Sequence, residues 1–262
     1  MRYARFVYKQ QIKYGVVEGS EVVPMEGSPF QEYRLTRERL DLERVKLLPP
    51  CQPTKVVCVG LNYADHAREF GDRPLPKEPV LFIKPPSAVI AAGEPIVYPQ
   101  VSQQVDPEAE LAVIIKEKAR RVTVREAGQK ILGYTCGNDV TARDLQRRDG
   151  QWTRSKSFDS FCPLGPWIVD RIDSGGVGIQ LLVNGEIRQN SNTSHMIFPV
   201  DYLVSYISQV MTLLPGDVIM TGTPSGVGPI NPGDNILIRI DGIGELYNPV
   251  VDEANQIYSL TK

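Results

Sequence analysis

Short apolar runs separated by glycine and proline constrain the fold of this chain more than any other feature of its sequence. Seven such runs occupy residues 80–84, 111–115, 131–139, 167–169, 178–185, 217–222 and 235–240. Runs of this length, rich in valine and isoleucine, are typical of strands. Only 124–130, 143–148 and 200–212 have the pattern of helices. With 22 glycines and 21 prolines between the runs, the sequence predicts a β-rich α+β fold rather than an alternating βαβ sheet.

A proline-rich segment predicts a domain boundary near residue 50. The stretch LLPPCQPTK places three prolines between residues 49 and 53, which prevents regular structure there. Before it, short strands and a charged segment at 35–48 that could form a helix indicate a small N-terminal α/β module. We therefore expect two parts, a module of residues 1–50 and a larger domain of residues 51–262.

The overall charge argues against polyanionic partners. The formal net charge is −2, and no long block of basic residues occurs, so the chain has no field that would gather nucleic acid or anionic lipid. We expect neither a nucleic-acid partner nor a membrane partner.

Cysteine usage and the absence of long apolar segments favour a cytoplasmic protein. Cys51, Cys58, Cys136 and Cys162 have spacings that match neither a zinc knuckle nor a disulfide framework, so we expect reduced core thiols. The N-terminus lacks the apolar core of a secretory signal, and no apolar stretch approaches the roughly 20 residues that span a bilayer.

The stretch DPEAELAVII, residues 106–115, sets acidic residues at alternate positions ahead of an apolar run. On a strand, Glu108 and Glu110 would project to one face, about 6 to 7 Å apart. Their repulsion must be offset by a cation, by basic side chains or by water. Because no histidine or cysteine is near in sequence, a metal here would be a hard ion such as Mg²⁺, Mn²⁺ or Ca²⁺. The alternative is an edge strand with a solvated acidic face.

A third acidic candidate, Asp139, lies where the run 131–139 ends. Thr141 and Asp144 resemble a capping box, which predicts a helix that begins just after Asp139. Arg143 and Gln146 would then share one face of its first turn, beside the carboxylate. The alternative is a simple ion pair between Asp139 and Arg143.

One of the two histidines follows a predicted strand, in the segment GLNYADHAREF. If this segment is helical, His66 and Glu69 stand three residues apart and can form a hydrogen-bonded general base. The alternative is a surface contact between the two side chains. We interpret the other histidine, His195, as a structural polar residue.

Three further pieces are ambiguous. Lys84 and Lys156 adjoin apolar segments, where a lysine either extends to solvent or pairs with an anion. The loop MTGTPSGVGP contains Thr223 and Gly226, and its glycines would let backbone N–H groups approach a carboxylate ligand, unless the loop is only a tight hairpin.

Several of these segments occur in the order typical of a known family. GLNYADHAREF, LFIKPPSA, DPEAELAVII, GYTCGNDVTARDLQ, RSKSF, VNGEIRQNSNTSHMIF and LLPGDVIMTGTPSGVGP together resemble the fumarylacetoacetate hydrolase superfamily, and the first fifty residues are similar to the N-terminal module of its small bacterial members. The resemblance implies a mixed β-roll domain, a Mg²⁺ or Mn²⁺ ion and a homodimer.

The resemblance also implies residue roles. By position, the metal ligands would be Glu108, Glu110 and Asp139, and the catalytic dyad would be His66 with Glu69. The positions that match family contacts to substrate oxygens or the metal surroundings are Arg143, Gln146, Lys156, Thr223 and, in the same loop, Gly226. His195 departs from the pattern, because many relatives carry aspartate there.

The family's substrates are 2-oxo and 2,4-dioxo acids. The resemblance therefore implies a metal-dependent hydrolase or decarboxylase of small 2-oxo acids, of the acylpyruvate hydrolase or oxaloacetate decarboxylase type. A second candidate is an isomerase of aromatic catabolism, acting on 2-hydroxyhepta-2,4-diene-1,7-dioate or 5-carboxymethyl-2-hydroxymuconate. A third is a non-catalytic protein that binds an oxo acid, although such a protein would not need the dyad of His66 and Glu69.

Overall fold

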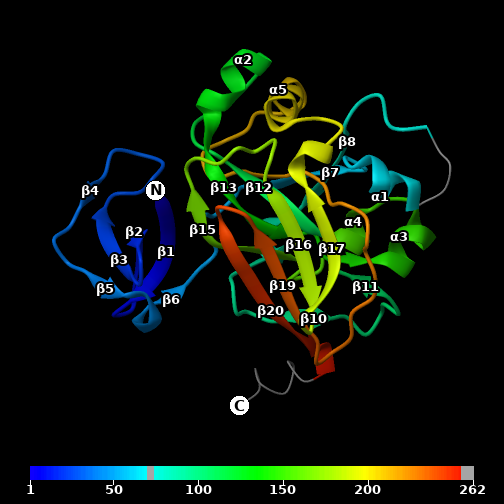
Figure 1. The fold of residues 1–262 in the computed structure, drawn as a ribbon, viewed down its shortest axis with the longest axis horizontal. Coiled ribbons are helices and arrows are strands. Elements are labelled where there is room, and N and C mark those ends of the chain that lie inside the picture. The colour runs from blue at the N-terminus through cyan, green and yellow to red at the C-terminus, as the bar shows by residue number, and fades with distance from the viewer. Residues whose placement is uncertain (70–73, 255–262) are drawn as a thin grey trace.

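The computed structural model describes residues 1–69 and 74–254, and the first fifty residues form a lobe of strands at one side of the molecule (Figure 1). Three antiparallel strands form a meander, and three very short strands pair with them. Phe6, Val22 and Leu40 are buried in its small core. The strands are β1 (Arg2–Tyr8), β2 (Gln11–Glu18), β3 (Glu21–Glu26), β4 (Arg34–Leu35), β5 (Leu40–Asp41) and β6 (Lys46–Leu47).

The helix that we expected within the charged segment 35–48 is wrong. The segment contains β5, a single 3₁₀ turn, η1 (Leu42–Arg44), and β6. Asp41 accepts a hydrogen bond from the Glu43 N–H at 3.1 Å and so fixes this turn. Leu40 and Val45 bury their side chains in the core of the lobe, which requires the chain to pass along β3 and β1 in extended form.

One large sheet runs through both parts of the chain. Its thirteen strands include the path β4-β3-β2-β1-β15-β13-β12-β18-β7-β8. β1 pairs with β15, with Tyr3 opposite Ile168, so the N-terminal lobe extends the sheet of the larger part. The boundary near residue 50 stays a prediction. The strands of the larger part are β7 (Val56–Gly60), β8 (Val80–Lys84), β9 (Val89–Ile90), β12 (Ala109–Ile115), β13 (Ile131–Asn138), β15 (Cys162–Val169) and β18 (Val218–Met220).

A second sheet covers one face of the first and encloses the main core. Its five strands lie in the order β10-β20-β19-β16-β17. Leu111 and Val113 of β12 pack in one apolar cluster with Leu181 of β16 and Ile238 of β19. The strands are β10 (Ile96–Tyr98), β16 (Gly178–Val183), β17 (Glu186–Asn192), β19 (Asn235–Ile240) and β20 (Gly244–Asp252); β11 (Val105–Asp106) and β14 (Thr141–Ala142) form a separate pair.

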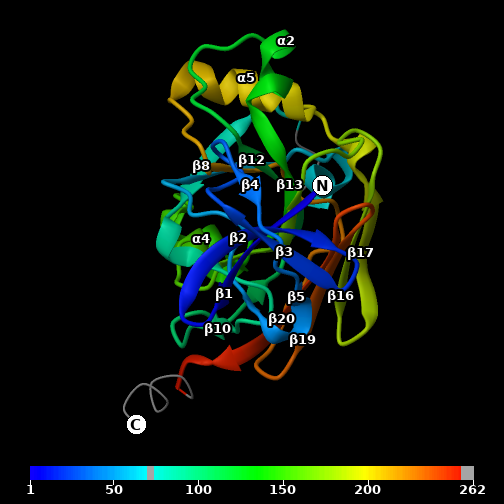
Figure 2. The ribbon, with the colours of Figure 1, turned by 90° about the vertical axis from the view of Figure 1, so that its left-hand side faces the viewer.

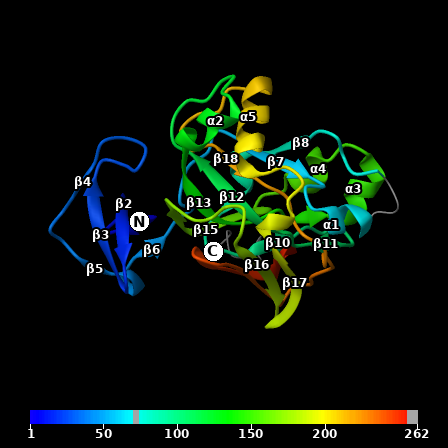
Figure 3. The same ribbon diagram turned by 45° about the horizontal axis from the view of Figure 1, so that its top comes forward.

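The helices form two groups. α2 (Val124–Ala127) and α5 (Val200–Val210) pack side by side at one end of the sheets (Figure 2). α1 (Ala64–Glu69), α3 (Arg143–Asp149) and α4 (Thr153–Lys156) lie on the side away from the N-terminal lobe (Figure 3). The 3₁₀ turns of the larger part are η2 (Pro86–Ala88), η3 (Gly128–Lys130) and η4 (Thr193–His195).

The β-rich α+β fold class is confirmed, and each of the seven predicted strand runs contains a strand. The predicted helices correspond to α2 with η3, to α3 and to α5. β17 was missed because its sequence, EIRQNSN, has no apolar run. It is a strand because Asn184 and Gly185, both with positive φ, form a two-residue hairpin turn after β16.

In the described part of the chain, no helix combines the length and the apolar character that a bilayer crossing requires.

Candidate active site

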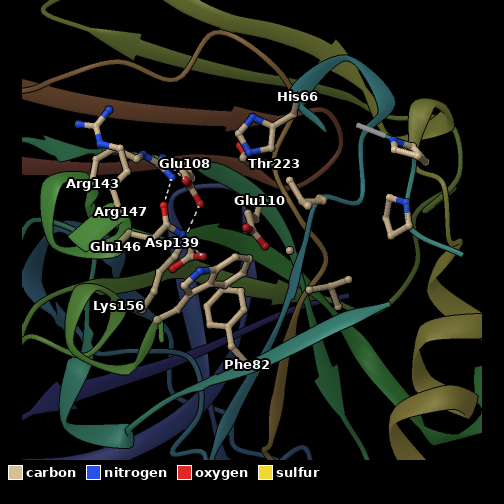
Figure 4. A pocket seen from close by; sticks show the side chains of 16 residues that line it. His66, Phe82, Glu108, Glu110, Asp139, Arg143, Gln146, Arg147, Lys156 and Thr223 are labelled. Atoms are coloured by element: carbon tan, nitrogen blue, oxygen red, sulfur yellow. Dashed lines mark hydrogen bonds and ion pairs between the residues drawn. The ribbon is translucent and has the colours of Figure 1, made fainter. Parts of the chain in front are cut away.

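Three carboxylates meet where the start of β12 lies beside the end of β13. Glu108 immediately precedes β12, Glu110 is its second residue, and Asp139 follows the last residue of β13. The two strands are antiparallel, with Glu110 opposite Gly137, and the Asp139 N–H donates to the Glu108 carbonyl at 2.9 Å. The three side chains point into one cavity (Figure 4), and each offers an oxygen within 4.8 Å of the others.

This carboxylate cluster is buried. β12 lies between β13 and β18, near the middle of the large sheet. Glu108, Glu110 and Asp139 are only 3%, 2% and 0% exposed. The alternative of a solvated edge strand is therefore wrong, and the negative charges must be balanced inside the protein.

Two lysines from separate elements face the cluster. Lys84, the last residue of β8, pairs with Asp139 Oδ1 and donates to the Val140 carbonyl at 3.0 Å. Lys156, at the end of α4, places Nζ 2.9 Å from Glu108 Oε2 and 2.6 Å from Asp139 Oδ2. Both lysines are buried, so both behave as paired cations rather than as side chains that extend to solvent.

Arg143, the first residue of α3, supplies a third cation. Its Nε lies 2.8 Å from Asp106 Oδ2, its Nη2 pairs with Glu108 Oε1, and its Nη1 donates to Gln146 Oε1 at 2.7 Å. The expected convergence of carboxylate, guanidinium and amide is thus present. The carboxylates that hold Arg143 are Asp106 and Glu108, however, whereas Asp139 pairs with the two lysines.

The charges do not balance at Glu110. Four buried carboxylates, Asp106 and the three of the cluster, face the three cations named above. In the described residues Glu110 forms no ion pair, and its hydrogen bond comes from the Gly222 N–H at 2.7 Å. Burial, followed by the negative charges of Asp139 and Glu108, raises the pKa of Glu110 well above its usual range. Burial also acts to raise the pKa of Glu108, but Lys156 and Arg143 outweigh it and lower that pKa.

The donor set fits a hard divalent cation. All three groups offer carboxylate oxygen, and the cluster contains no nitrogen or sulfur ligand. Oxygen donors of this kind suit Mg²⁺ or Mn²⁺ better than zinc. A dication would also balance the charge of Glu110, which the surrounding side chains leave unpaired.

The capping box that we expected at the start of α3 is wrong. The N-cap residue is Ala142, which has no side-chain cap. Thr141 instead donates to the Asp139 carbonyl at 2.9 Å, and Asp144 accepts from the Ser102 hydroxyl at 2.6 Å. The two side chains therefore fix the neighbouring loops, which hold Asp139 and the start of α3 in place.

His66 and Glu69 form the expected pair on α1. His66 Nδ1 lies 2.8 Å from Glu69 Oε2; His66 is only 5% exposed and lines the cavity described below, whereas the Glu69 side chain is partly exposed. A carboxylate at Nδ1 favours the tautomer with its proton there, which makes Nε2 the basic nitrogen. In Figure 4 the imidazole lies on one side of the three carboxylates, with Phe82 and Lys156 on the other.

The loop after β18 holds α1 in position. The Ser225 hydroxyl donates to Asp65 at 2.8 Å, and the Gly226 N–H donates to Glu69 Oε1 at 2.8 Å. Asp65 in turn accepts from the His66 N–H at 2.8 Å. Gly226 therefore supports Glu69 directly, and its expected contact with substrate stays a prediction.

A cavity of about 480 Å³ joins these groups. Thr223, whose hydroxyl accepts from Gln189 Nε2 at 2.8 Å, also lines it. Glu69, Gly226 and His195 are not among its lining residues in the described chain; His195 is exposed near Ser191, 3.2 Å away. The predicted site residues that line the cavity are His66, Glu108, Glu110, Asp139, Arg143, Gln146, Lys156 and Thr223.

Sequence reasoning left several site residues unassigned. The role of Lys84 stayed ambiguous, and its signal was a lysine at the end of an apolar strand. Phe82 and Trp152 form an aromatic wall, with ring centroids 5.2 Å apart. The Lys156 ammonium lies 5.0 Å from the centroid of Phe82. Arg147 is a further cation of the lining.

The sequence matches a family model over most of its length. The model of the fumarylacetoacetate hydrolase C-terminal domain matches residues 55–251. The chain belongs to the fumarylacetoacetate hydrolase family. A second model, the Rv2993c-like N-terminal domain, matches residues 1–50. The resemblance identified from the motifs is thus confirmed.

Named members of the fumarylacetoacetate hydrolase family are similar to this chain over most of its length. The 5-carboxymethyl-2-hydroxymuconate delta-isomerase of Mycobacterium smegmatis is 44% identical, with a TM-score of 0.91 over 97% of this chain and 100% of that chain. The mitochondrial oxaloacetate tautomerase of Xenopus laevis is 41% identical over 84% of this chain and 71% of its own length. A maleylpyruvate hydrolase of Sphingobium sp. SYK-6, solved with manganese(II) and pyruvate, is 32% identical, with a TM-score of 0.79 over 96% and 99% of the two chains. By their names, these relatives are an isomerase, a tautomerase and a hydrolase.

Proposed function

We propose that this protein is a divalent-metal-dependent enzyme that moves a proton next to the 2-oxo group of small 2-oxo acids, as a tautomerase or isomerase. One observation carries the proposal: the buried carboxylate cluster and His66, whose Nδ1 is paired with Glu69, line one cavity (Figure 4). Proton transfer beside a carbonyl requires an electrophilic group at the oxygen and a base at the carbon. This cavity offers a place for each.

Glu108, Glu110 and Asp139 would hold the metal ion. A Mg²⁺ or Mn²⁺ ion bound there would act as a Lewis acid and stabilise negative charge on the oxygens of a 2-oxo acid.

His66 is the base in this proposal. Its Nε2 would take a proton from the carbon next to the oxo group and return it at another position. Glu69, 2.8 Å from Nδ1, orients the ring and stabilises the imidazolium that forms. The Gly226 N–H holds the other oxygen of Glu69, so the base enters the reaction already positioned.

Lys156 and Arg143 place fixed positive charges beside the cluster. Burial acts to lower the pKa of Lys156, but Asp139 and Glu108 outweigh it and raise that pKa, so the ammonium stays charged. Fixed positive charges of this kind stabilise an anion that develops during reaction, because they need no reorganisation. Gln146 and Thr223 add polar groups that can orient the substrate.

Hydrolysis of a C–C bond in 2,4-dioxo acids is a second candidate. The same histidine could activate a water molecule, and a relative named maleylpyruvate hydrolase shares this fold. Decarboxylation, the other activity expected from the sequence, needs no base, so the His66–Glu69 pair would have no role in it. For this reason we rank decarboxylation below proton transfer as the function of this site.

Two substitutions at the chain's two histidines test the proposal. With Mn²⁺ present, the wild type should accelerate the enol–keto conversion of oxaloacetate, and EDTA should abolish this. His66→Asn should lower kcat by about 100-fold or more, the usual range for loss of a general base. His195→Asn is the matched control, because His195 lies outside the cavity lining.

Equal effects of the two substitutions would contradict the role of His66. Metal-dependent binding of oxo acids with no turnover of oxaloacetate, 2,4-dioxo acids or 2-hydroxymuconates would favour the non-catalytic oxo-acid-binding protein instead.

A further inference from the structure

The cavity contains a second cationic feature, Arg147, away from the carboxylate cluster. Arg147 lies on α3 four residues after Arg143, so their Cα atoms are about 6 Å apart along the helix axis. Both side chains line the cavity. Figure 4 shows them on the same side of the carboxylates.

A neutral side chain positions Arg147. Its Nη2 donates to Gln104 Oε1 at 2.6 Å. The amide nitrogen of Gln104 donates to both oxygens of Asp106, at 3.1 and 3.3 Å, so the amide oxygen must face the arginine. Asp106 is itself held by Arg143. This chain of contacts fixes the guanidinium without neutralising it.

Arg147 therefore differs from the other cations of the lining. Arg143 and Lys156 each pair with two carboxylates of the protein. Arg147 has no ion pair with any residue of the described chain, and its recorded partner is an uncharged amide. A guanidinium has five N–H donors in a planar fork that matches a carboxylate. Most of these donors remain available to a ligand.

We propose that Arg147 binds a second, distal carboxylate of the substrate, which makes the natural substrate a dicarboxylic 2-oxo acid. This inference rests on the proposed function, which directs the 2-oxo acid end of the substrate to the carboxylate cluster. Because Arg147 lies about one turn of α3 beyond Arg143, which pairs with the cluster, the two carboxylates of the substrate must be several bonds apart. Leu61, Phe82 and Trp152, which also line the cavity, offer apolar contact to the carbon chain between them.

Two seven-carbon compounds isolate this contact. 2,4-Dioxoheptanedioate and 2,4-dioxoheptanoate share the same reacting end and differ only in a terminal carboxylate or methyl group. Both can be followed with Mn²⁺ by the loss of enol absorbance, and coupled lactate dehydrogenase reports pyruvate if the C–C bond is hydrolysed. The wild type should prefer the dioate.

Arg147→Gln should remove that preference. Loss of a charge-assisted hydrogen-bonded pair predicts a fall of roughly 10- to 100-fold in kcat/KM for the dioate, mostly through KM, and less than about a twofold change for the monoacid. Arg147→Lys should retain part of the preference, because an ammonium supplies charge without the fork. Arg148→Gln is the matched control: Arg148 is exposed, lies 3.6 Å from Asp149 and does not line the cavity.

The outcomes separate this inference from the proposed function. Equal losses on both compounds, or no loss on the dioate, would overturn the role of Arg147 while leaving the proposed function intact. If the wild type converts neither compound, nor oxaloacetate, the proposed function is wrong. Calorimetry on the same pair then still tests Arg147, because tighter binding of the dioate should disappear in Arg147→Gln; equal affinities in the wild type would overturn the inference.

Discussion

Glu110 shows how a single buried carboxylate can indicate a metal site. It sits on the central strand β12, 2% exposed, and accepts a hydrogen bond from Gly222, while the cations of the site pair with its neighbours. A buried anion without a cation is unfavourable in a folded protein. The burial of the Glu110 carboxylate is therefore expected of a metal ligand, and it destabilises the fold when no metal is bound.

Glu110→Gln should separate metal binding from folding. The substitution removes a ligand charge, so Mn²⁺ affinity measured by calorimetry should fall by at least about 100-fold. In EDTA the variant should unfold at the same or a higher temperature than the wild type, because an unpaired buried charge has been removed. Glu117→Gln, at an exposed residue paired with Lys130 at 2.7 Å, should change neither property. Wild-type Mn²⁺ affinity in Glu110→Gln would exclude the proposed metal site.

At the scale of single residues, the sequence predicted the site residues whose contacts lie within one strand or one helix. The alternation of Glu108 and Glu110, and the i,i+3 spacings of His66 with Glu69 and of Arg143 with Gln146, express geometry within one element. The pairing of Lys84 with Asp139 could not be predicted in this way, because it joins the end of β8 to the end of β13 across the sheet. The same holds for Gln104, whose contact with Arg147 depends on how α3 packs.

Among the elements, the dependence of α1 on the loop after β18 has the clearest consequence. α1 is only six residues long, too short to be stable by itself. Its acidic side chains are held by Ser225 and Gly226. The base of the site is therefore positioned by a loop about 160 residues further along the chain.

Gly226→Ala should disturb this support. Gly226 has φ +97°, and a Cβ there would lie 2.2 Å from the Arg188 carbonyl oxygen. We expect a loss of about 1 to 3 kcal/mol in the free energy of unfolding, together with lower kcat as Glu69 loses its N–H donor. Gly228→Ala is the control, because a Cβ at that glycine meets nothing within 4 Å. Denaturant unfolding and kinetics on both variants provide the test, and indistinguishable variants would contradict this reading.

One short helix, α4, was missed by the sequence patterns. It has four residues, little more than one turn, so it shows no apolar periodicity. Trp152 directly precedes α4 and contacts Phe82 of β8, so packing places this helix rather than intrinsic propensity. By contrast, the seven apolar runs are specified by their own composition, and each contains a strand.

Across the whole molecule, Asp217 joins the linker after the N-terminal lobe to the large sheet. It is fully buried just before β18 and accepts hydrogen bonds from Thr54 N–H at 3.0 Å and Oγ1 at 2.6 Å, Lys55 N–H at 3.2 Å and Leu214 N–H at 2.8 Å. It also pairs with the Lys55 ammonium. One carboxylate thus fixes the segment that leads from the first fifty residues into β7.

Asp217→Ala should lower the free energy of unfolding by about 3 to 5 kcal/mol, since it leaves the buried donors and the Lys55 charge without an acceptor. Asp234→Ala provides a control in the same Pro-Gly-Asp sequence, because Asp234 is partly exposed and accepts fewer bonds, from Asn231 and Asn184 at 2.7 Å. We expect about 1 kcal/mol there. Chemical denaturation measures both, and a loss at Asp217 no larger than at Asp234 would refute its linking role.

The four cysteines should be unreactive in the native protein. All four are free and buried, as expected from their spacing. Burial raises the pKa of Cys162 to about 12 and the pKa of the other three thiols well above the usual range. A raised pKa favours the neutral thiol, and the thiolate is the reactive form. Labelling with Ellman's reagent should therefore stay slow from pH 7 to pH 9 and reach four thiols only in guanidinium chloride; rapid labelling of the native protein would contradict the buried positions.

The aromatic wall and the carboxylate cluster of the site come from different parts of the fold. A Cβ at Gly60 would lie 2.7 Å from the Trp152 ring, so the glycine makes room for the tryptophan, which packs against Phe82. This wall rests on β7, β8 and the residue before α4, whereas the carboxylates belong to β12 and β13. Libraries that vary positions 60 and 152 can thus alter substrate scope while the carboxylate cluster keeps its place on β12 and β13, which gives directed evolution a natural starting point in this scaffold.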